Sequence, residues 1–218
     1  MLRALGVIPW NTDWKGLLIH ERTKVIEGVW IARTNQLFLK DRIERDRESL
    51  TCHELVHALQ DKHLDLDGLL AFVPGDSDRH AARLHLVEGD AVETVRRIWI
   101  PEREMPDVVP TPEAFEPPPY LTRMLQSPYD AGPAFVRTLL DAGGNSARNA
   151  AFKNPPVSTE QVLHPEKYLA GEKPLTVLLP LLPRAGAVWE HIDTFGQLAL
   201  RNALKIWMRS RGVRSSFR

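Results

Sequence analysis

Hydrophobic and polar residues follow two different periods in the N-terminal third of the chain. Residues 17–40 read as extended, and within them the β-branched and aromatic run Val25–Ala32, a turn segment at Arg33–Asn35 and the alternating Gln36–Lys40 predict a β-hairpin. From about Arg42 to Gln60, apolar residues recur every three or four positions, which predicts a helix. The pattern therefore places a small sheet directly before an amphipathic helix.

Further elements are predicted downstream of this helix. A helix capped by Asp76, Ser77 or Asp78 is expected to run to about Trp99 and to stop before Pro101. The segment TVLLPLL, residues 176–182, is expected to form a buried strand. Three more helices are predicted: one from about Pro133 to Gly143–Gly144, a short one capped by Ser158 with Gln161, and a final amphipathic one over Thr194–Ser210.

Length and loop composition indicate the domain organisation. The chain has 218 residues, which suits one domain with a sizeable core. Residues 101–119 hold seven prolines and several acidic residues, so they predict a connecting loop rather than a core element. We therefore expect residues 1–218 to form a single α+β domain that is mainly helical, with a small N-terminal sheet.

Charge and composition exclude some classes of partner. Lys+Arg and Asp+Glu both number 28, so there is no basic excess to attract nucleic acid or an anionic membrane. The apolar run Leu175–Leu182 is interrupted by Pro180 and is far too short to span a bilayer. The chain as given shows no signal peptide, so we expect it to be cytoplasmic, or secreted or periplasmic if a leader was trimmed. Its one cysteine permits no intrachain disulfide.

The candidate chemistry is concentrated in TCHELVHALQDKH, residues 51–63. His53 and His57 are four residues apart, so a helix places their imidazoles nearly above one another. Glu54 lies alongside them, where it can take a proton from water while the two imidazoles bind an ion. The pattern predicts a site for one zinc ion, with Glu54 as general base and not as a ligand. The adjacent arc is expected to be buried in the core: Cys52, Leu55, Val56 and Leu59.

Two residues compete for the place of third ligand. His63 has the spacing of the last histidine in H-E-x-x-H-x-x-G-x-x-H, but Gln60 stands where that motif has its turn-forming glycine. If the helix continues, His63 lies at about 20° around it and His57 at about 140°, so the two diverge. Glu88 falls in the middle of the apolar stripe of the next helix, where a carboxylate needs a cation. We therefore predict Glu88 as the third ligand; the alternatives are His63 as the ligand, or a buried Arg or Lys as the partner of Glu88.

The ligating histidines are also expected to have hydrogen-bond partners of their own. Asp61, Asp90 and Glu93 are the candidates, and helical geometry places Asp61 best. A solvated face is the alternative for the other two. Arg148 is a candidate for binding a substrate carboxylate, with an ordinary surface position as its alternative.

These residues together resemble a known class of enzymes. HELVHALQD is similar to the active helix of thermolysin-like gluzincins, the zinc peptidases with an H-E-x-x-H pair and a downstream glutamate. With VEGDA and PPVSTEQVLHPEKY, it looks like a group of bacterial metallopeptidases, over nearly the whole chain. The resemblance implies a zincin-like fold, with His53, His57 and Glu88 as zinc ligands and Glu54 as general base and acid. It also implies that the hairpin edge binds an extended peptide or protein substrate.

The chain departs from the thermolysin pattern in two places. Glu88 follows His57 by 31 residues, a longer gap, and Val92 stands where thermolysin has an aspartate. The resemblance further implies a His or Tyr opposite the metal to stabilise the oxyanion, for which His164 and Tyr168 are available. Their alternative role is structural, closing a short helix and packing beneath it. The expected function is a zinc-dependent peptidase; the alternative is a zincin-fold binding protein with little or no turnover.

Overall fold

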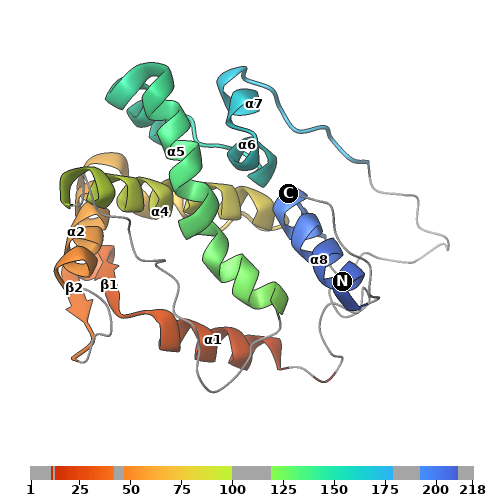
Figure 1. The fold of residues 1–218 in the computed structure, drawn as a ribbon, viewed down its shortest axis with the longest axis horizontal. Coiled ribbons are helices and arrows are strands. Elements are labelled where there is room, and N and C mark those ends of the chain that lie inside the picture. Colours follow the sequence, from red (N-terminus) through yellow and green to blue (C-terminus); the bar gives the residue numbers. More distant parts are fainter. Residues whose placement is uncertain (1–10, 12, 42–46, 100–118, 179–191, 211–218) are drawn as a thin grey trace.

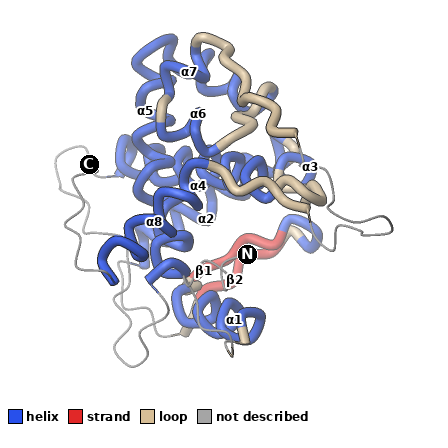
Figure 2. The backbone as a smooth tube through the Cα atoms, turned by 90° about the vertical axis from the view of Figure 1, so that its right-hand side faces the viewer, coloured by secondary structure: helices blue, strands red, loops and turns tan. Residues whose placement is uncertain are grey.

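The computed structural model describes residues 11, 13–41, 47–99, 119–178 and 192–210. The described residues are mainly helical, with one two-stranded antiparallel sheet (Figures 1 and 2), as the sequence predicts. In chain order the elements are α1 (Trp14–Val25), β1 (Gly28–Ile31), a 3-10 turn (Ala32–Thr34), β2 (Gln36–Leu39), α2 (Arg47–Leu64), α3 (Leu66–Leu69), α4 (Ser77–Trp99), α5 (Pro119–Lys153), α6 (Thr159–Leu163), α7 (Pro165–Leu169) and α8 (Gln197–Ser210).

The predicted hairpin is confirmed, and it packs against α2. β1 and β2 pair antiparallel with Gly28 opposite Leu39 and Trp30 opposite Leu37. Asn35 ends the connecting turn in the left-handed region at φ 54°, which asparagine tolerates better than most residues. The hairpin, red in Figure 2, lies on the side of α2 that carries Glu54.

The prediction of extended structure before the hairpin is wrong, because α1 occupies Trp14–Val25. Asp13 starts this helix: its side chain accepts a hydrogen bond from the Gly16 N–H at 3.0 Å, and its carbonyl accepts one from the Leu17 N–H at 2.9 Å. This capping interaction, followed by good helix formers, outweighs the weak extended pattern.

The core lies where α4 crosses α5 (Figure 1). Gly89 and Gly132 meet at the crossing: a Cβ on Gly89 would lie 2.3 Å from the Gly132 carbonyl carbon. No side chain fits there, so the two backbones are in direct contact. The core side chains at 0% exposure include Leu86, Phe135, Val136 and Leu139. The predicted span of α4 is confirmed, with Asp76 accepting from the Arg79 N–H at 3.2 Å as its cap.

Helix α5 starts well before the predicted Pro133 and contains both Pro128 and Pro133. A proline lacks the N–H that would bind the carbonyl four residues earlier. For Pro128 that carbonyl is Met124, and the Ser127 hydroxyl donates to it instead, at 3.0 Å. The predicted end at Gly143–Gly144 is confirmed as a break: Gly144 has φ 61° and ψ −152°, after which a second helical segment runs to Lys153.

The C-terminal third follows the prediction in its helices but not in its strand. Ser158 caps α6 by accepting from the Gln161 N–H at 3.3 Å. Helix α8 matches the predicted amphipathic helix from Gln197 onwards. The predicted buried strand over 176–182 is wrong in its described part: residues 172–178 form no strand, and Val177 is 86% exposed. In the described sheet β1 and β2 pair only with each other, so this segment does not add a third strand.

Some expectations concern residues that the structure does not describe. The start of the predicted metal helix (42–46), the rest of the predicted strand (179–182) and the proline-rich loop apart from Pro119 lie outside the described residues. Among the helices of the described segments, none has the length and apolar character needed to cross a membrane.

Candidate metal centre

Helix α2 turns its polar side inwards. Glu54, His57 and Gln60 are 6%, 9% and 2% exposed, whereas Leu55 and Leu59 are 49% and 58% exposed. The prediction that the arc of Cys52, Leu55, Val56 and Leu59 is buried in the core is therefore wrong: the two leucines are exposed, and Cys52 and Val56 are only half-buried. The polar side instead faces α4 and the hairpin, which supply hydrogen-bond partners to each of these three buried groups.

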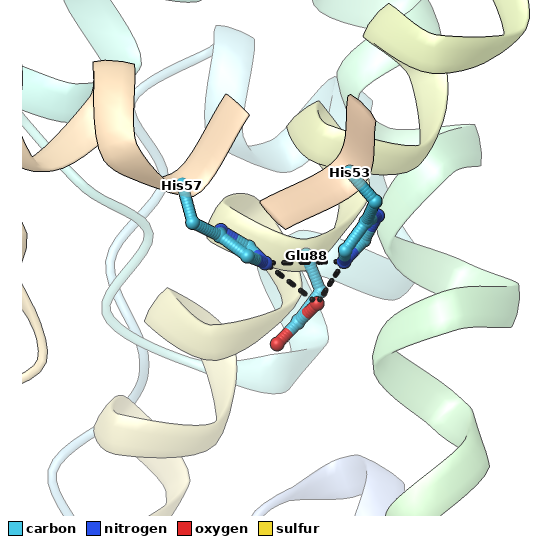
Figure 3. A group of neighbouring side chains, drawn as sticks. All are labelled: His53, His57 and Glu88. Carbon is cyan, nitrogen blue, oxygen red and sulfur yellow. Dashed lines mark hydrogen bonds and ion pairs between the residues drawn. The ribbon is translucent and has the colours of Figure 1, made fainter. Parts of the chain in front are cut away.

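Three of the predicted site residues converge between α2 and α4. His53 Nε2 lies 3.2 Å from Glu88 Oε2, His57 Nε2 lies 3.4 Å from the same oxygen, and the two nitrogens are 3.1 Å apart. Figure 3 shows the Glu88 carboxylate pointing between the two imidazoles, which come from one turn of α2. Among the described residues, this group meets the geometric requirement for holding a metal ion.

The donor triangle has the size that zinc requires. Ligand distances of about 2.0–2.1 Å in a tetrahedral site imply donor–donor separations of about 3.3–3.4 Å. The three observed separations are 3.1, 3.2 and 3.4 Å, so small side-chain shifts suffice to admit the ion. Two imidazole nitrogens and one carboxylate oxygen are also the ligand set of many catalytic zinc sites, which leave a fourth position open.

The electrostatics of the group favour a positive charge among the three side chains. Burial would raise the pKa of Glu88, but hydrogen bonds from His53 and His57 outweigh it and hold that pKa well below its usual range. Burial would lower the pKa of His57, but Glu88 and Gln60 raise it to about 9. A proton or a metal ion can provide the positive charge, so a cation and protons compete for the same place.

Glu54 lies beside His53, His57 and Glu88 and is held by the hairpin. Its Oε2 accepts a hydrogen bond from the Trp30 N–H at 3.0 Å. Gly28 makes room for it, because a Cβ there would lie 2.9 Å from Glu54 Cγ. Burial raises the pKa of the Glu54 carboxyl, although His53 and His57 partly oppose this. A raised pKa makes the Glu54 carboxylate a stronger base, which suits it to accept a proton from water.

The hydrogen-bond partner of His57 is a residue to which the sequence assigns no role. Gln60 Oε1 lies 2.8 Å from His57 Nδ1, and Gln60 Nε2 donates to Asp90 Oδ2 at 2.8 Å. Asp61, the best-placed candidate by helical geometry, accepts instead from the Trp30 indole at 3.5 Å. Asp90 therefore supports the histidine only through Gln60, a connection that requires knowing how α2 and α4 face each other.

The other two charged candidates are in structural ion pairs. Glu93 is 1% exposed and accepts hydrogen bonds from Arg96, Arg97 and Arg137. Arg148 donates to Asp90 Oδ2 at 3.3 Å, so it binds a carboxylate of this chain.

The structure supports the choice of Glu88 over His63. Helix α2 continues past Gln60, its predicted end, to Leu64, which is the case in which His63 and His57 diverge. His63 lies exposed in its last turn and is not part of the metal-binding group of the described residues.

His164 and Tyr168 make contacts elsewhere in the molecule. Tyr168 donates to the Asn154 carbonyl at 2.7 Å, and His164 Nε2 lies 3.0 Å from Gln197 Nε2. Their segment begins at Thr159, which donates to Asp78 at the start of α4, about 15 Å along that helix from Glu88 at 1.5 Å per residue. Figure 1 shows α2 and α6 towards opposite ends of α4. A role for these two side chains in an oxyanion site stays a prediction.

Tyr129 is the aromatic residue that the fold brings to the ligands. Its ring centroid lies 6.2 Å from that of His53, and it is half-buried. No sequence signal points to it, because Pro128 and Pro133 make residues 119–132 an improbable helix.

No protein family, curated protein or solved structure matches the chain.

Proposed function

We propose that this protein is a zinc-dependent peptidase with a zincin-like site. The observation that carries the proposal is the donor triangle of His53, His57 and Glu88, with edges of 3.1, 3.2 and 3.4 Å and a buried Glu54 next to it. A zinc ion held by these ligands supplies Lewis-acid chemistry, lowering the pKa of water and polarising a carbonyl oxygen. The ligand set and the acid–base residue are those that zinc-assisted peptide hydrolysis uses.

Glu54 performs the proton transfers in this proposal. Its Oε2 is fixed by the Trp30 N–H. Oε1 takes a proton from the attacking water and later gives it to the leaving amine. The hairpin therefore sets the direction in which the general base points.

The edge of β1 that faces away from β2 supports a peptide as substrate. Glu27 and Lys40 are joined by a backbone hydrogen bond of 2.8 Å, so alternate residues from Glu27 turn their backbone groups towards β2. Gly28 and Trp30 therefore point theirs the other way, and the Trp30 N–H reaches Glu54. An extended chain that pairs with this edge lies next to the general base.

Tyr129 is our candidate for stabilising the oxyanion, in preference to His164 and Tyr168. Its ring centroid lies 6.2 Å from that of the candidate ligand His53, whereas the segment with His164 and Tyr168 begins at Thr159, which donates to Asp78 at the start of α4. A phenol near the reacting carbonyl can donate a hydrogen bond to the developing negative charge. We expect Tyr129→Phe to lower kcat at unchanged zinc content and Tyr168→Phe to leave kcat unchanged; the opposite pattern would favour Tyr168 for this role.

The proposal is tested by metal analysis together with digestion of a peptide library. We expect the wild type to carry one zinc ion per chain and to cleave peptides until a chelator removes the metal. Glu54→Gln should keep the zinc and lose about 10²–10⁴-fold of the cleavage rate. Glu48→Gln, an exposed change on the same helix, is the matched control and should behave as wild type.

Each unfavourable result has a distinct meaning. Cleavage by Glu54→Gln at the wild-type rate contradicts the proposed mechanism. A wild type that binds zinc and cleaves no peptide or unfolded protein favours the binding-protein alternative.

A further inference from the structure

A chain of buried hydrogen bonds leads from the metal site to α5. His57 Nδ1 lies 2.8 Å from Gln60 Oε1, and Gln60 Nε2 donates to Asp90 Oδ2 at 2.8 Å and to the Val87 carbonyl at 3.0 Å. Arg148 then donates to Asp90 Oδ2 at 3.3 Å. Gln60 and Asp90 are each 2% exposed, so water does not substitute for these contacts.

The partners of Gln60 fix which way its amide faces. The Val87 carbonyl is an acceptor only, and Asp90, paired with Arg148, is a carboxylate that accepts. The amide NH2 must therefore face these two groups, and Oε1 must face His57. A carbonyl oxygen can only accept, so the Nδ1 atom of His57 carries the hydrogen.

This assignment determines what the other nitrogen of His57 can do. A neutral imidazole with its hydrogen on Nδ1 has its lone pair on Nε2. Nε2 is the atom that lies 3.4 Å from Glu88 and 3.1 Å from His53 Nε2. The ring is thus presented to the metal position by the nitrogen that can bind.

We propose that Gln60 is a positioning residue, anchored by Asp90 and Arg148, that fixes the ring and the tautomer of His57 for metal binding. The proposal rests on the metal site of the proposed function. It assigns a role to a residue which otherwise only continues α2 past His57. It also links the site to the second segment of α5, which carries Arg148 beyond the break at Gly143–Gly144.

The first test is the zinc dissociation constant of Gln60→Met, measured by competition with a chelator. Methionine keeps the length of the side chain but can neither accept from Nδ1 nor donate to Asp90. We expect zinc to bind about 10–100-fold more weakly, the range found when such outer partners are removed. The matched control is Gln161→Met: Gln161 is also buried, at 5% exposure, and bonds to Val157 and Glu172 away from the site.

A reciprocal exchange separates positioning from simple loss of stability. Gln60→Glu alone places a carboxylate against Asp90 and should weaken zinc binding. Adding Asp90→Asn relieves this repulsion, because the amide introduced at position 90 can donate to the carboxylate introduced at position 60, which still accepts from Nδ1 of His57. The Val87 carbonyl loses its donor, and Arg148 loses the oxygen that it shares with Gln60. We therefore expect the double variant to bind zinc more tightly than Gln60→Glu but more weakly than the wild type.

Nitrogen-15 NMR reads the tautomer directly. The zinc form should show hydrogen on Nδ1 of His57 in the wild type and in the double variant Gln60→Glu with Asp90→Asn. A zinc-bound wild type with no hydrogen on that atom would overturn the assignment.

The outcomes are distinguishable from a failure of the proposed function. If the wild type binds no zinc, the metal site itself is wrong. If the wild type binds zinc and Gln60→Met binds it equally well, Gln60 does not position His57. The same conclusion follows if Gln161→Met loses as much affinity as Gln60→Met, or if the double variant binds no better than Gln60→Glu. If Gln60→Met does not fold, the exchange pair and the NMR assignment still decide.

Discussion

Helices α2 and α4 face each other across the candidate metal site, yet they are held in place by different forces. α4 buries an apolar stripe, with Leu86 and Val87 at 0% and 1% exposure. α2 buries its polar side and leaves Leu55 and Leu59 about half exposed, at 49% and 58%. Hydrophobic burial therefore positions α4, whereas hydrogen bonds to the hairpin and to α4 position α2.

This difference suggests how stability and function are divided. The crossing of α4 with α5 forms the core, and it carries Glu88 on a rigid support. α2 carries His53, Glu54 and His57 on a face whose contacts are polar, and the two histidines belong to the group that could hold a metal ion. We expect α2 to be the less stable of the two in the metal-free protein, because segments with few buried apolar contacts open more readily.

The largest effect is expected from a substitution in the apolar core between α4 and α5. Phe135→Ala removes a fully buried ring, at 0% exposure, from the α4–α5 core. We expect the free energy of unfolding to fall by about 3–5 kcal/mol, from lost burial and the cavity left behind. Urea denaturation of metal-free protein measures this; a loss below about 1 kcal/mol would mean that the core lies elsewhere.

Two buried histidines, one on α2 and one on α4, should respond differently to pH. His57 on α2 has charged partners and a pKa raised to about 9, whereas His85 on α4 bonds to the Ala81 carbonyl and burial lowers its pKa to about 4. Below pH 6.5, the usual pKa of the group, His85 takes up a proton in the unfolded chain but not in the folded one. Stability should therefore fall between pH 6.5 and pH 4, by about 3 kcal/mol from this residue.

The variant His85→Leu isolates this contribution from the other titrating groups. The difference in unfolding free energy between wild type and variant should change with pH over that window and be flat above it. Parallel curves would show that His85 is not held neutral in the fold.

Metal binding should act on α2 more than on α4. At a free zinc concentration of about 100 times the dissociation constant, the free energy of unfolding should rise by about 2.7 kcal/mol. Amide hydrogen exchange should show new protection concentrated in Arg47–Leu64, with less change in Ser77–Trp99. Equal protection of both helices would show that zinc binding does not stabilise α2 more than α4.

The smallest effect is expected on the exposed side of α2. Leu55→Ser and Leu59→Ser alter side chains that are about half exposed, at 49% and 58%, so each should change stability by about 0.5 kcal/mol or less. Zinc affinity should stay at the wild-type value. A loss of several kcal/mol, of the size expected for Phe135→Ala, would show that this face is buried after all.

Local signals in the sequence predict the elements and most of the site. The hairpin, α4, the Ser158 cap and the break at Gly143–Gly144 follow from short-range rules, and the two histidines with Glu54 follow from helical spacing. Glu88 can be predicted because a carboxylate within an apolar stripe needs a partner. These inferences depend on one element at a time.

What the sequence does not reveal depends on how elements meet. The inward face of α2 is mispredicted because the leucines form the apolar arc, and only the position of α4 shows that the polar face has partners. The roles of Gln60 and Tyr129 depend on α4 and α5 in the same way. Helix α5 is predicted too short because Pro128 argues against it, and the compensating Ser127 hydroxyl bond to Met124 has no sequence signature of its own.

We expect Glu88, and not His63, to complete the metal site with His53 and His57. The most direct measurement is the zinc dissociation constant of the wild type, Glu88→Ala and His63→Ala under identical conditions. We expect Glu88→Ala to bind zinc more than about 100-fold more weakly, since loss of a ligand exceeds the loss of an outer partner, and His63→Ala to bind it as the wild type does. Full zinc binding by Glu88→Ala together with loss of zinc from His63→Ala would contradict the account.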